Sequence, residues 1–510
     1  MSSSASSRGQ PPHRLMWLHS RPLLLFAFAF AIMADPVSSV AYAIEAALRA
    51  LGGDLSLLLP TMGLVLGLIA LVIPNYHQLV ARYPQGGGAA AAAGDAFGEA
   101  WAFVPMGALI VDFVLTIAIS CAAAAAALIA YLPALAAWRV PLALVLVVAV
   151  GAVTWFGHLG RAVFATMTVG FIVAAVLVLV YGVAAEPHPT GTISSTPPHT
   201  PPVAVALAFP VAMALATGVE APSSAIAQLG QLVGPGRRRF GRITLWLTLG
   251  IVSTITLGLT IEAMRLRVGV PHANTTQLAE LARVAAPAPV FAVFQLMTAL
   301  LLLAAACSSF EAGPGLLKAL ARQTLSEGQT TGILPAPLGR TNLHHTPFWS
   351  LLLFIALSAV VTVAAGAREQ RLVVFYAVAV FLSFLAGLAA MSVFFRRERR
   401  PAQLAVSLVG TFGVAFTLAV NLARGYPIVS LAAATLVAAV FYWLWIRAGR
   451  PRGIAGTVAE PDAGANSSAQ PPQPEPQGER EGREQPQHDP AQRFPRRRPD
   501  HPRTRRHPRA

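Results

Sequence analysis

Twelve long apolar runs, separated by mostly short polar loops, constrain this chain more than any other feature of its sequence. The hydrocarbon core of a bilayer is ~30 Å thick, so a helix needs about 20 apolar residues to cross it. The runs cover residues 22–48, 55–80, 101–130, 139–157, 161–184, 203–229, 241–263, 289–312, 347–365, 371–395, 402–422 and 427–447. We therefore predict an all-α integral membrane protein with about twelve transmembrane helices.

The composition agrees with a membrane location and argues against other classes of function. Of the residues, 55% are hydrophobic and only 12% are charged. The net charge of +15 does not indicate a nucleic-acid partner, because 13 of the 37 Lys and Arg residues lie from Arg447 onward in a polar tail. Cys121 and Cys307 each lie inside an apolar run, without neighbours at metal-ligand spacing. No hydrolytic Ser-His-Asp pattern is evident, so we expect neither an enzyme nor a cofactor.

Loop charges predict the orientation of the spans. Lys and Arg are about twice as frequent on the side that includes the N-terminus, and such residues favour the cytoplasm. We expect a multi-pass protein of the cell membrane with both termini in the cytoplasm. Its predicted parts are a leader at 1–21, a transporter domain at 22–447 and a basic tail at 448–510 that lacks periodic hydrophobicity and is expected to be disordered.

Two of the apolar runs are interrupted in the same way. The first contains "DPVSS" at 35–39, and the sixth contains "EAPSS" at 220–224, preceded by Thr217 and Gly218. Proline removes a backbone donor and clashes with the carbonyl four residues earlier. In lipid such a break is tolerated only where it is buried in protein or lines a cavity. Breaks five spans apart predict a transporter of inverted repeats with its site at the bilayer midplane; two ordinary proline kinks are the alternative.

Three carboxylates lie deep within apolar runs, and they suggest the chemistry of the site. Asp35, Asp112 and Glu220 have no basic residue within their own span cores. A charge at the centre of a membrane helix costs ~2.5–3.5 kcal/mol on insertion scales. An unpaired carboxylate there takes up a proton or holds a cation. These acids therefore predict a site for positive charge.

Hydroxyl groups accompany the acids along the same helices. Thr116 lies one helical turn after Asp112, and Tyr42 lies two turns after Asp35, so each pair shares a helix face. Ser38, Ser39, Thr217 and Tyr376 add further hydroxyl oxygens. Such hard oxygen ligands suit a hard cation. Each Ser or Thr alone is equally consistent with a bond to its own helix backbone.

These motifs resemble a known group of permeases. "DPVSSVAYAIE" at 35–45, "YPQGGGAAAAA" at 83–93 and "ATGVEAPSSAI" at 216–226 are similar to the amino acid-polyamine-organocation superfamily. Asp35 with "SSVAY", the pair Asp112 and Thr116, "TGVE" at 217–220 and "VVFYAVAVF" at 373–381 resemble the KUP-type bacterial potassium importers. The resemblance covers roughly residues 22–447, although those importers usually carry a folded cytoplasmic domain after the spans, where this chain has its polar tail.

The resemblance implies a LeuT-like fold and roles for individual residues. It implies two inverted five-helix repeats plus two further helices, with discontinuous first and sixth helices. The cation ligands would be Asp35, Tyr42, Asp112, Thr116, Thr217 and Tyr376, with potassium held at the first five, and Glu220 would be the proton-coupling acid. The helix breaks would be formed by Pro36, Ser38, Ser39, Gly218 and Pro222.

The function expected from these observations is proton-coupled potassium uptake by alternating access. The alternative within the superfamily is an amino acid or polyamine permease, although a substrate carboxylate beside Asp35 would cost about 4 kcal/mol at an effective dielectric of 20. A channel or sensor with the same fold is a further alternative, but the sequence has no repeated motif of the kind that forms a channel's selectivity filter. The expected partners are potassium ions and protons, or an amino acid or polyamine, together with the lipid bilayer and a second copy of the chain in a homodimer.

Overall fold

The structure, a computed structural model, describes residues 21–157, 161–195, 199–226, 229, 232, 234–324, 330–425, 428–451 and 453–454. The predictions for residues 1–20 and 455–510 fall outside this range. The described residues are almost entirely helical, as predicted. Apart from isolated bridges, the described sheet structure is one hairpin, in which β1 (Gln323–Thr324) pairs antiparallel with β2 (Thr330–Thr331).

Ten helical segments of the described chain are long and apolar enough to cross a membrane. Their main helices are α5 (Leu58–Arg82), α7 (Phe103–Tyr131), α8 (Arg139–Trp155), α9 (Arg161–Ala184), α10 (Pro201–Ala212) with its continuation to Ala225, α12 (Gly234–Leu266), α14 (Ala288–Leu320), α16 (Glu369–Arg397), α17 (Pro401–Ala423) and α18 (Ile428–Arg447). The two other predicted spans are helical but shorter or divided. They are α15 (Phe348–Ala364) and the series α2 (Arg21–Ile32), α3 (Ala34–Ser38) and α4 (Val40–Ala50).

Two helices in the connections were not predicted. The ten-residue α6 (Gly88–Phe97) begins at the third of three consecutive glycines and is rich in alanine, so its sequence resembles a flexible loop. The nine-residue α13 (Gln277–Ala285) is amphipathic, and its N-cap Thr276 accepts a hydrogen bond from the backbone amide of Ala279 at 3.2 Å. Short helices like these depend on capping and on packing against the spans.

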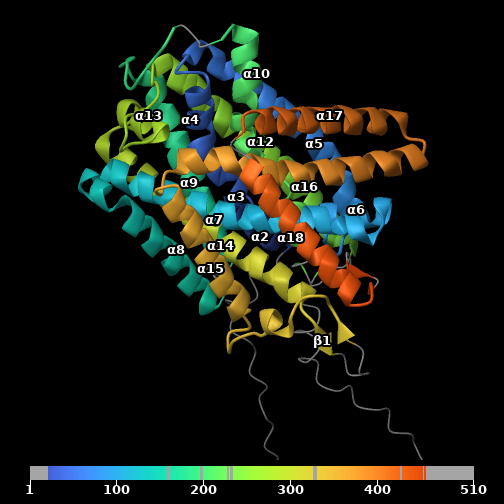
Figure 1. Ribbon diagram of the computed structural model, residues 1–510. Coiled ribbons are helices and arrows are strands. Elements are labelled where there is room, and N and C mark those ends of the chain that lie inside the picture. Colours follow the sequence, from blue (N-terminus) through green and yellow to red (C-terminus); the bar gives the residue numbers. More distant parts are fainter. Residues whose placement is uncertain are drawn as a thin grey trace, which may run out of the picture. The chain divides into compact units, whose positions relative to one another are not determined.

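Helix α7 is the most buried of the described candidate spans, with 89% of its apolar window inside the protein. It packs against α8, α14, α15, α16 and α18 (Figure 1). A run of alanines fills much of its length, and small side chains let membrane helices approach closely. The approach to α18 depends on Gly107, where a Cβ atom would lie 2.6 Å from the carbonyl oxygen of Ala434.

We expect Gly107→Ala to lower the thermal stability of the protein in detergent. The added methyl group would meet backbone atoms of α18, which cannot rotate away, and overpacking of this kind costs about 1–3 kcal/mol. Gly63→Ala is the matched control, because Gly63 is also helical and has no atom within 4 Å of an added Cβ. Thermal unfolding of both variants measures the difference. Equal stability of the two would contradict the close contact between α7 and α18.

Contacts at the helix ends agree with the predicted alternation of the spans. At one end of the bundle, Arg82, the last residue of α5, forms an ion pair with Glu398, which follows α16. At the other end, the connection 185–202 forms bridges from Thr190 and Thr192 to Val268 and Val270, which follow α12. Each contact joins segments that the alternating order places on the same side of the membrane.

Candidate functional site

The interruption in the first apolar run is slight. Helices α2, α3 and α4 are separated only at Met33 and Ser39, and both residues keep right-handed helical backbone angles. Pro36 leaves the helix short of one donor. The hydroxyl of Ser38 donates to the carbonyl of Asp35, and that of Ser39 donates to the carbonyl of Pro36, both at 2.7 Å. The serine pair thus binds the backbone that the interruption loosens.

The interruption in the sixth apolar run is a true break. After α10 and the short helix η4 (Met213–Ala216), Thr217 is extended, with ψ of 140°. Gly218 then takes a φ of +70°, which disfavours any residue with a side chain. The chain becomes helical again in α11 (Ala221–Ala225), where Pro222 lies in the first turn. The hydroxyls of Thr217 and Ser223 donate to the carbonyls of Ala214 and Glu220, at 2.8 and 2.7 Å.

The two interruptions lie directly against each other. A Cβ atom on Gly218 would be 2.7 Å from the carboxyl carbon of Asp35 and 2.9 Å from Cδ of Pro36. The hydroxyl of Ser39 also reaches the carbonyl of Leu215, at 3.3 Å. The carboxylate of Asp35 therefore stands beside the broken backbone of the sixth span, and only glycine leaves room for it.

The deep polar residues gather at this junction. Tyr42 on α4 is fully buried, and its hydroxyl lies close to the side chains of Ser39 and Thr217 and within electrostatic reach of Asp35 and Asp112. On α7, Asp112 and Thr116 are both buried. The side chain of Tyr376, on α16, lies outside the described part of the structure.

One oxygen of Asp35 lacks a hydrogen bond. Its Oδ1 atom is fully buried, and no described residue donates to it. A buried carboxylate oxygen without a donor is costly unless the group takes up a proton or meets a cation. The junction of the two interruptions therefore favours positive charge, either as a proton on Asp35 or as a bound cation.

Glu220 lies at the same junction and is held by two neutral donors. Its Oε2 atom accepts hydrogen bonds from the Tyr76 hydroxyl of α5 at 3.1 Å and from the Ser383 hydroxyl of α16 at 3.0 Å. Glu220 also lies within electrostatic reach of Asp35. Tyr76 and Ser383 were not among the predicted site residues, although each is a polar residue inside an apolar run.

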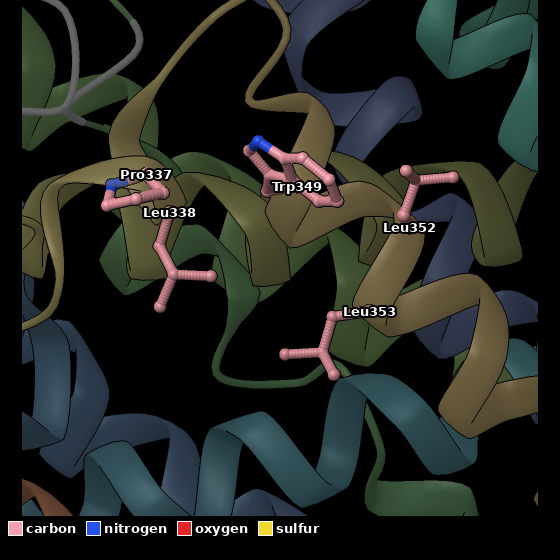
Figure 2. A pocket seen from close by; sticks show the side chains of 5 residues that line it. All are labelled: Pro337, Leu338, Trp349, Leu352 and Leu353. Atoms are coloured by element: carbon pink, nitrogen blue, oxygen red, sulfur yellow. The ribbon is translucent and has the colours of Figure 1, made fainter.

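A surface groove between η6 (Ala336–Gly339) and α15 does not share these properties. It is lined by Pro337, Leu338, Trp349, Leu352 and Leu353, and Figure 2 shows no acidic side chain among them. An apolar lining of this kind has no oxygen ligands to replace the water molecules that a hydrated cation must lose. The groove is therefore not part of the candidate site.

Comparison with known proteins places the chain among transporters. A family model for amino acid permeases matches residues 23–448. The potassium transporter KimA of Bacillus subtilis is 28% identical over 399 residues, which are 75% of this chain and 63% of KimA. A crystal structure of the manganese transporter of Eremococcus coleocola has a TM-score of 0.46 at 14% identity, covering 88% of this chain and 97% of that one. A second structure of that transporter, in complex with an aromatic bis-isothiourea substituted compound, has a TM-score of 0.47 at 14% identity, with the same coverage.

Proposed function

This chain belongs to the amino acid permease family and is a multi-pass membrane transporter, and we propose that it imports potassium ions together with protons. The single observation that carries this proposal is the buried, donor-free oxygen of Asp35 at the junction of the two interrupted spans. The similarity to KimA, which is named a potassium transporter, supports potassium as the cation.

We propose ligands for the ion from the residues at the junction and from the family resemblance. Its charge partners would be Asp35 and Asp112, and its neutral ligands the hydroxyl oxygens of Tyr42, Thr116 and Thr217. Tyr376, whose side chain lies outside the described part of the structure, is proposed as a sixth ligand on the resemblance alone. The hydroxyl of Thr217 donates to a backbone carbonyl, which leaves its oxygen lone pairs available to a cation. Oxygen ligands of mixed charge replace the water shell of a hard cation.

Glu220 is proposed to carry the coupled proton. Glu220 is held by two neutral hydroxyl donors, so it can both take up and release a proton. A cation beside Asp35 stabilises the charged form of Glu220 and therefore favours release of its proton, so joint import requires that both are bound before the site opens inward. The binding of the proton and the binding of the ion therefore influence each other at this site. Inward movement of each positive charge gains ~2.3 kcal/mol per 100 mV of membrane potential. From the charges of the loops, we propose that the protein lies in the plasma membrane with both termini in the cytoplasm. The homodimer remains a prediction.

We expect Glu220→Gln to remove the response of uptake to a proton gradient. The amide keeps the size of the side chain and can accept from Tyr76 and Ser383, but it cannot exchange a proton. Uptake of rubidium, a potassium substitute, into proteoliposomes should then be equal with and without an inward proton gradient. Tyr76→Phe is the graded comparison, because it removes one hydrogen bond to Glu220 and keeps the acid. A proton response that survives in Glu220→Gln would contradict this role.

The family match supports an amino acid or polyamine permease as the second candidate. Transport assays on the purified protein distinguish the two candidate functions by the substrate that accumulates. Proteoliposomes that contain the natural chain should accumulate rubidium under an inward proton gradient and should not accumulate labelled amino acids or spermidine. Accumulation of an amino acid or polyamine without rubidium uptake would establish the second candidate. Rubidium flux that ignores the proton gradient would instead indicate a channel.

A further inference from the structure

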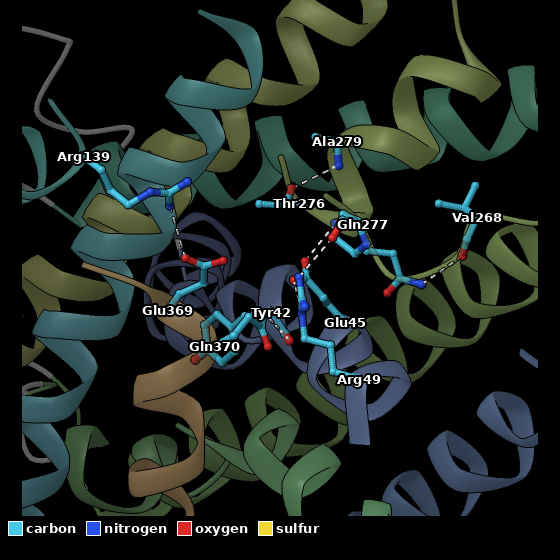
Figure 3. Close-up of polar contacts among 11 residues, drawn as sticks. Tyr42, Glu45, Arg49, Arg139, Val268, Thr276, Gln277, Ala279, Glu369 and Gln370 are labelled. Carbon is cyan, nitrogen blue, oxygen red and sulfur yellow. Dashed lines mark hydrogen bonds and ion pairs between the residues drawn. The ribbon is translucent and has the colours of Figure 1, made fainter. Parts of the chain in front are cut away.

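A second group of polar side chains, four of them charged, lies one helical turn beyond the site and takes no part in it. It consists of Glu45 and Arg49 on α4, Gln277 at the start of α13, Glu369 at the start of α16 and Arg139 at the start of α8 (Figure 3). We refer to these five residues as the outer latch. Under the predicted orientation, all of them lie on the extracellular side.

Glu45 connects the outer half of the first span to the loop helix α13. The residue is only 2% exposed, and its carboxylate accepts from Nε of Arg49 at 2.7 Å and from the backbone amide of Gln277 at 2.9 Å. Gln277 is the first residue of α13, where unpaired amides and the helix dipole favour an anion. Arg49 also donates to the carbonyl of Pro271 at 3.3 Å. Two separate side chains thus join α4 to the segment 271–277.

Glu369 and its neighbour connect the same half-helix to α16 and α8. The carboxylate of Glu369, in a residue that is 7% exposed, lies 3.8 Å from Nη1 of Arg139. The side-chain amide of Gln370 donates to the backbone carbonyl of Tyr42 at 3.4 Å. Glu45 and Glu369 are each within electrostatic reach of both Arg49 and Arg139. Two acids and two arginines therefore form one electrically balanced group.

The outer latch is connected to the candidate site through α4 and through Gln370, the residue after Glu369. Tyr42 lies three residues before Glu45 on α4, its carbonyl accepts from Gln370, and its hydroxyl lies within electrostatic reach of Asp35 and Asp112. We propose that the outer latch closes the extracellular route and positions Tyr42, with Glu45 as the positioning residue that holds α4 against α13 and α16. This inference rests on the proposed transport function.

The composition of the outer latch suits a contact that must open and close. The desolvation of a buried ion pair nearly cancels its Coulomb attraction, so forming it has a small net effect on free energy. When the route opens, water hydrates all four charged groups and replaces the bonds to α13 and α16. An apolar contact of the same area would favour the closed state much more strongly. Removing the charge of Glu45 weakens the closed state, because Arg49, whose side chain is 39% exposed, and Arg139 then share one buried carboxylate instead of two.

We expect Glu45→Gln to shift the protein toward the state that is open to the outside. The amide can still accept from Gln277, but it leaves Arg49 without its anion. A cysteine introduced by Ser39→Cys reports the opening, because Ser39 is 0% exposed in the structure. Its reaction with a membrane-impermeant thiol reagent, applied from outside, should become about tenfold faster in the Glu45→Gln background. The parent chain with only the buried Cys121 and Cys307 supplies the blank.

Transport kinetics distinguish positioning from a loss of structure. In the chain with Ser39 intact, Glu45→Gln should lower the maximal rate of rubidium uptake about tenfold without raising KM, because binding from outside persists while closure becomes rare. Glu45→Asp should restore part of the rate. Glu280→Gln is the control, since Glu280 pairs with Arg283 at 3.0 Å on the same helix α13 but outside the outer latch. It should change neither reactivity nor rate.

The cysteine-reactivity experiment and the rubidium-uptake experiment test different claims. Unchanged cysteine reactivity in Glu45→Gln would overturn the outer latch, even if the natural chain transports rubidium. A natural chain without rubidium uptake would overturn the proposed function, while the reactivity arm would still test the outer latch. A fall in the amount of folded protein with no rise in reactivity would show a purely structural role for Glu45.

Discussion

Asp35→Asn should abolish potassium uptake while the protein remains in the membrane. The amide preserves the size of the side chain but removes a full negative charge from the junction of the two interrupted spans. A cation 4 Å from the carboxylate is stabilised by about 4 kcal/mol at an effective dielectric of 20, which corresponds to a roughly thousandfold change in affinity. Growth of a potassium-uptake-deficient bacterium at low potassium measures this: the natural chain should support growth and Asp35→Asn should not.

The matched control is Asp95→Asn. Asp95 is an exposed aspartate in α6 that accepts a hydrogen bond from the Tyr83 hydroxyl at 2.8 Å, away from the junction. It should support growth as the natural chain does, with all three proteins present in equal amounts in the membrane. Growth of cells that carry Asp35→Asn at the natural rate would show that the charge of Asp35 is not needed for the ion.

Gly218→Ala should inactivate transport for a steric reason. The φ of +70° at this position is unfavourable for alanine by about 1–2 kcal/mol. The new Cβ would also be 2.7 Å from Oδ2 of Asp35, so the carboxylate or the break must move, and overpacking adds about 1–3 kcal/mol. We expect rubidium uptake by the purified variant to fall below about one tenth of the natural rate.

Gly98→Ala separates the two causes. Gly98 has a φ of +105° and no atom within 4 Å of an added Cβ, so alanine there strains the backbone without touching another residue. This variant should lose some thermal stability and keep its uptake rate per folded protein. If Gly218→Ala kept its uptake rate equally well, the close approach of the two interruptions would not matter for transport.

The outline of the fold and the main site residues could be predicted because membranes penalise polar groups severely. Asp35, Asp112 and Glu220 stand out in runs where every charge is costly, so their presence alone indicates a function. The two prolines beside Ser-Ser pairs identified the first and sixth spans as interrupted. The structure places Asp35, Tyr42, Thr217, Gly218 and Glu220 at one junction, where the two interruptions meet.

Other features depend on contacts that no local pattern records. The hydrogen bonds from Tyr76 and Ser383 to Glu220 join residues 144 and 163 positions apart. Helix α6 consists of alanines after a glycine cluster, and its order depends on the spans around it. The first interruption is slighter than expected because the hydroxyls of Ser38 and Ser39 bind nearby carbonyls while the helical backbone angles continue. Pairings over such distances arise only when the helices pack.

The most direct test of the cation site is to locate a heavy substitute for potassium in crystals of the protein. Thallium(I) resembles potassium in charge and size, and its anomalous scattering marks its position without reference to any transport assay. We expect one strong peak at direct coordination distance from Oδ1 of Asp35 and the hydroxyl of Tyr42, and the loss of that peak in Asp35→Asn. A strong peak elsewhere, with none at the junction of the two interruptions, would contradict this expectation.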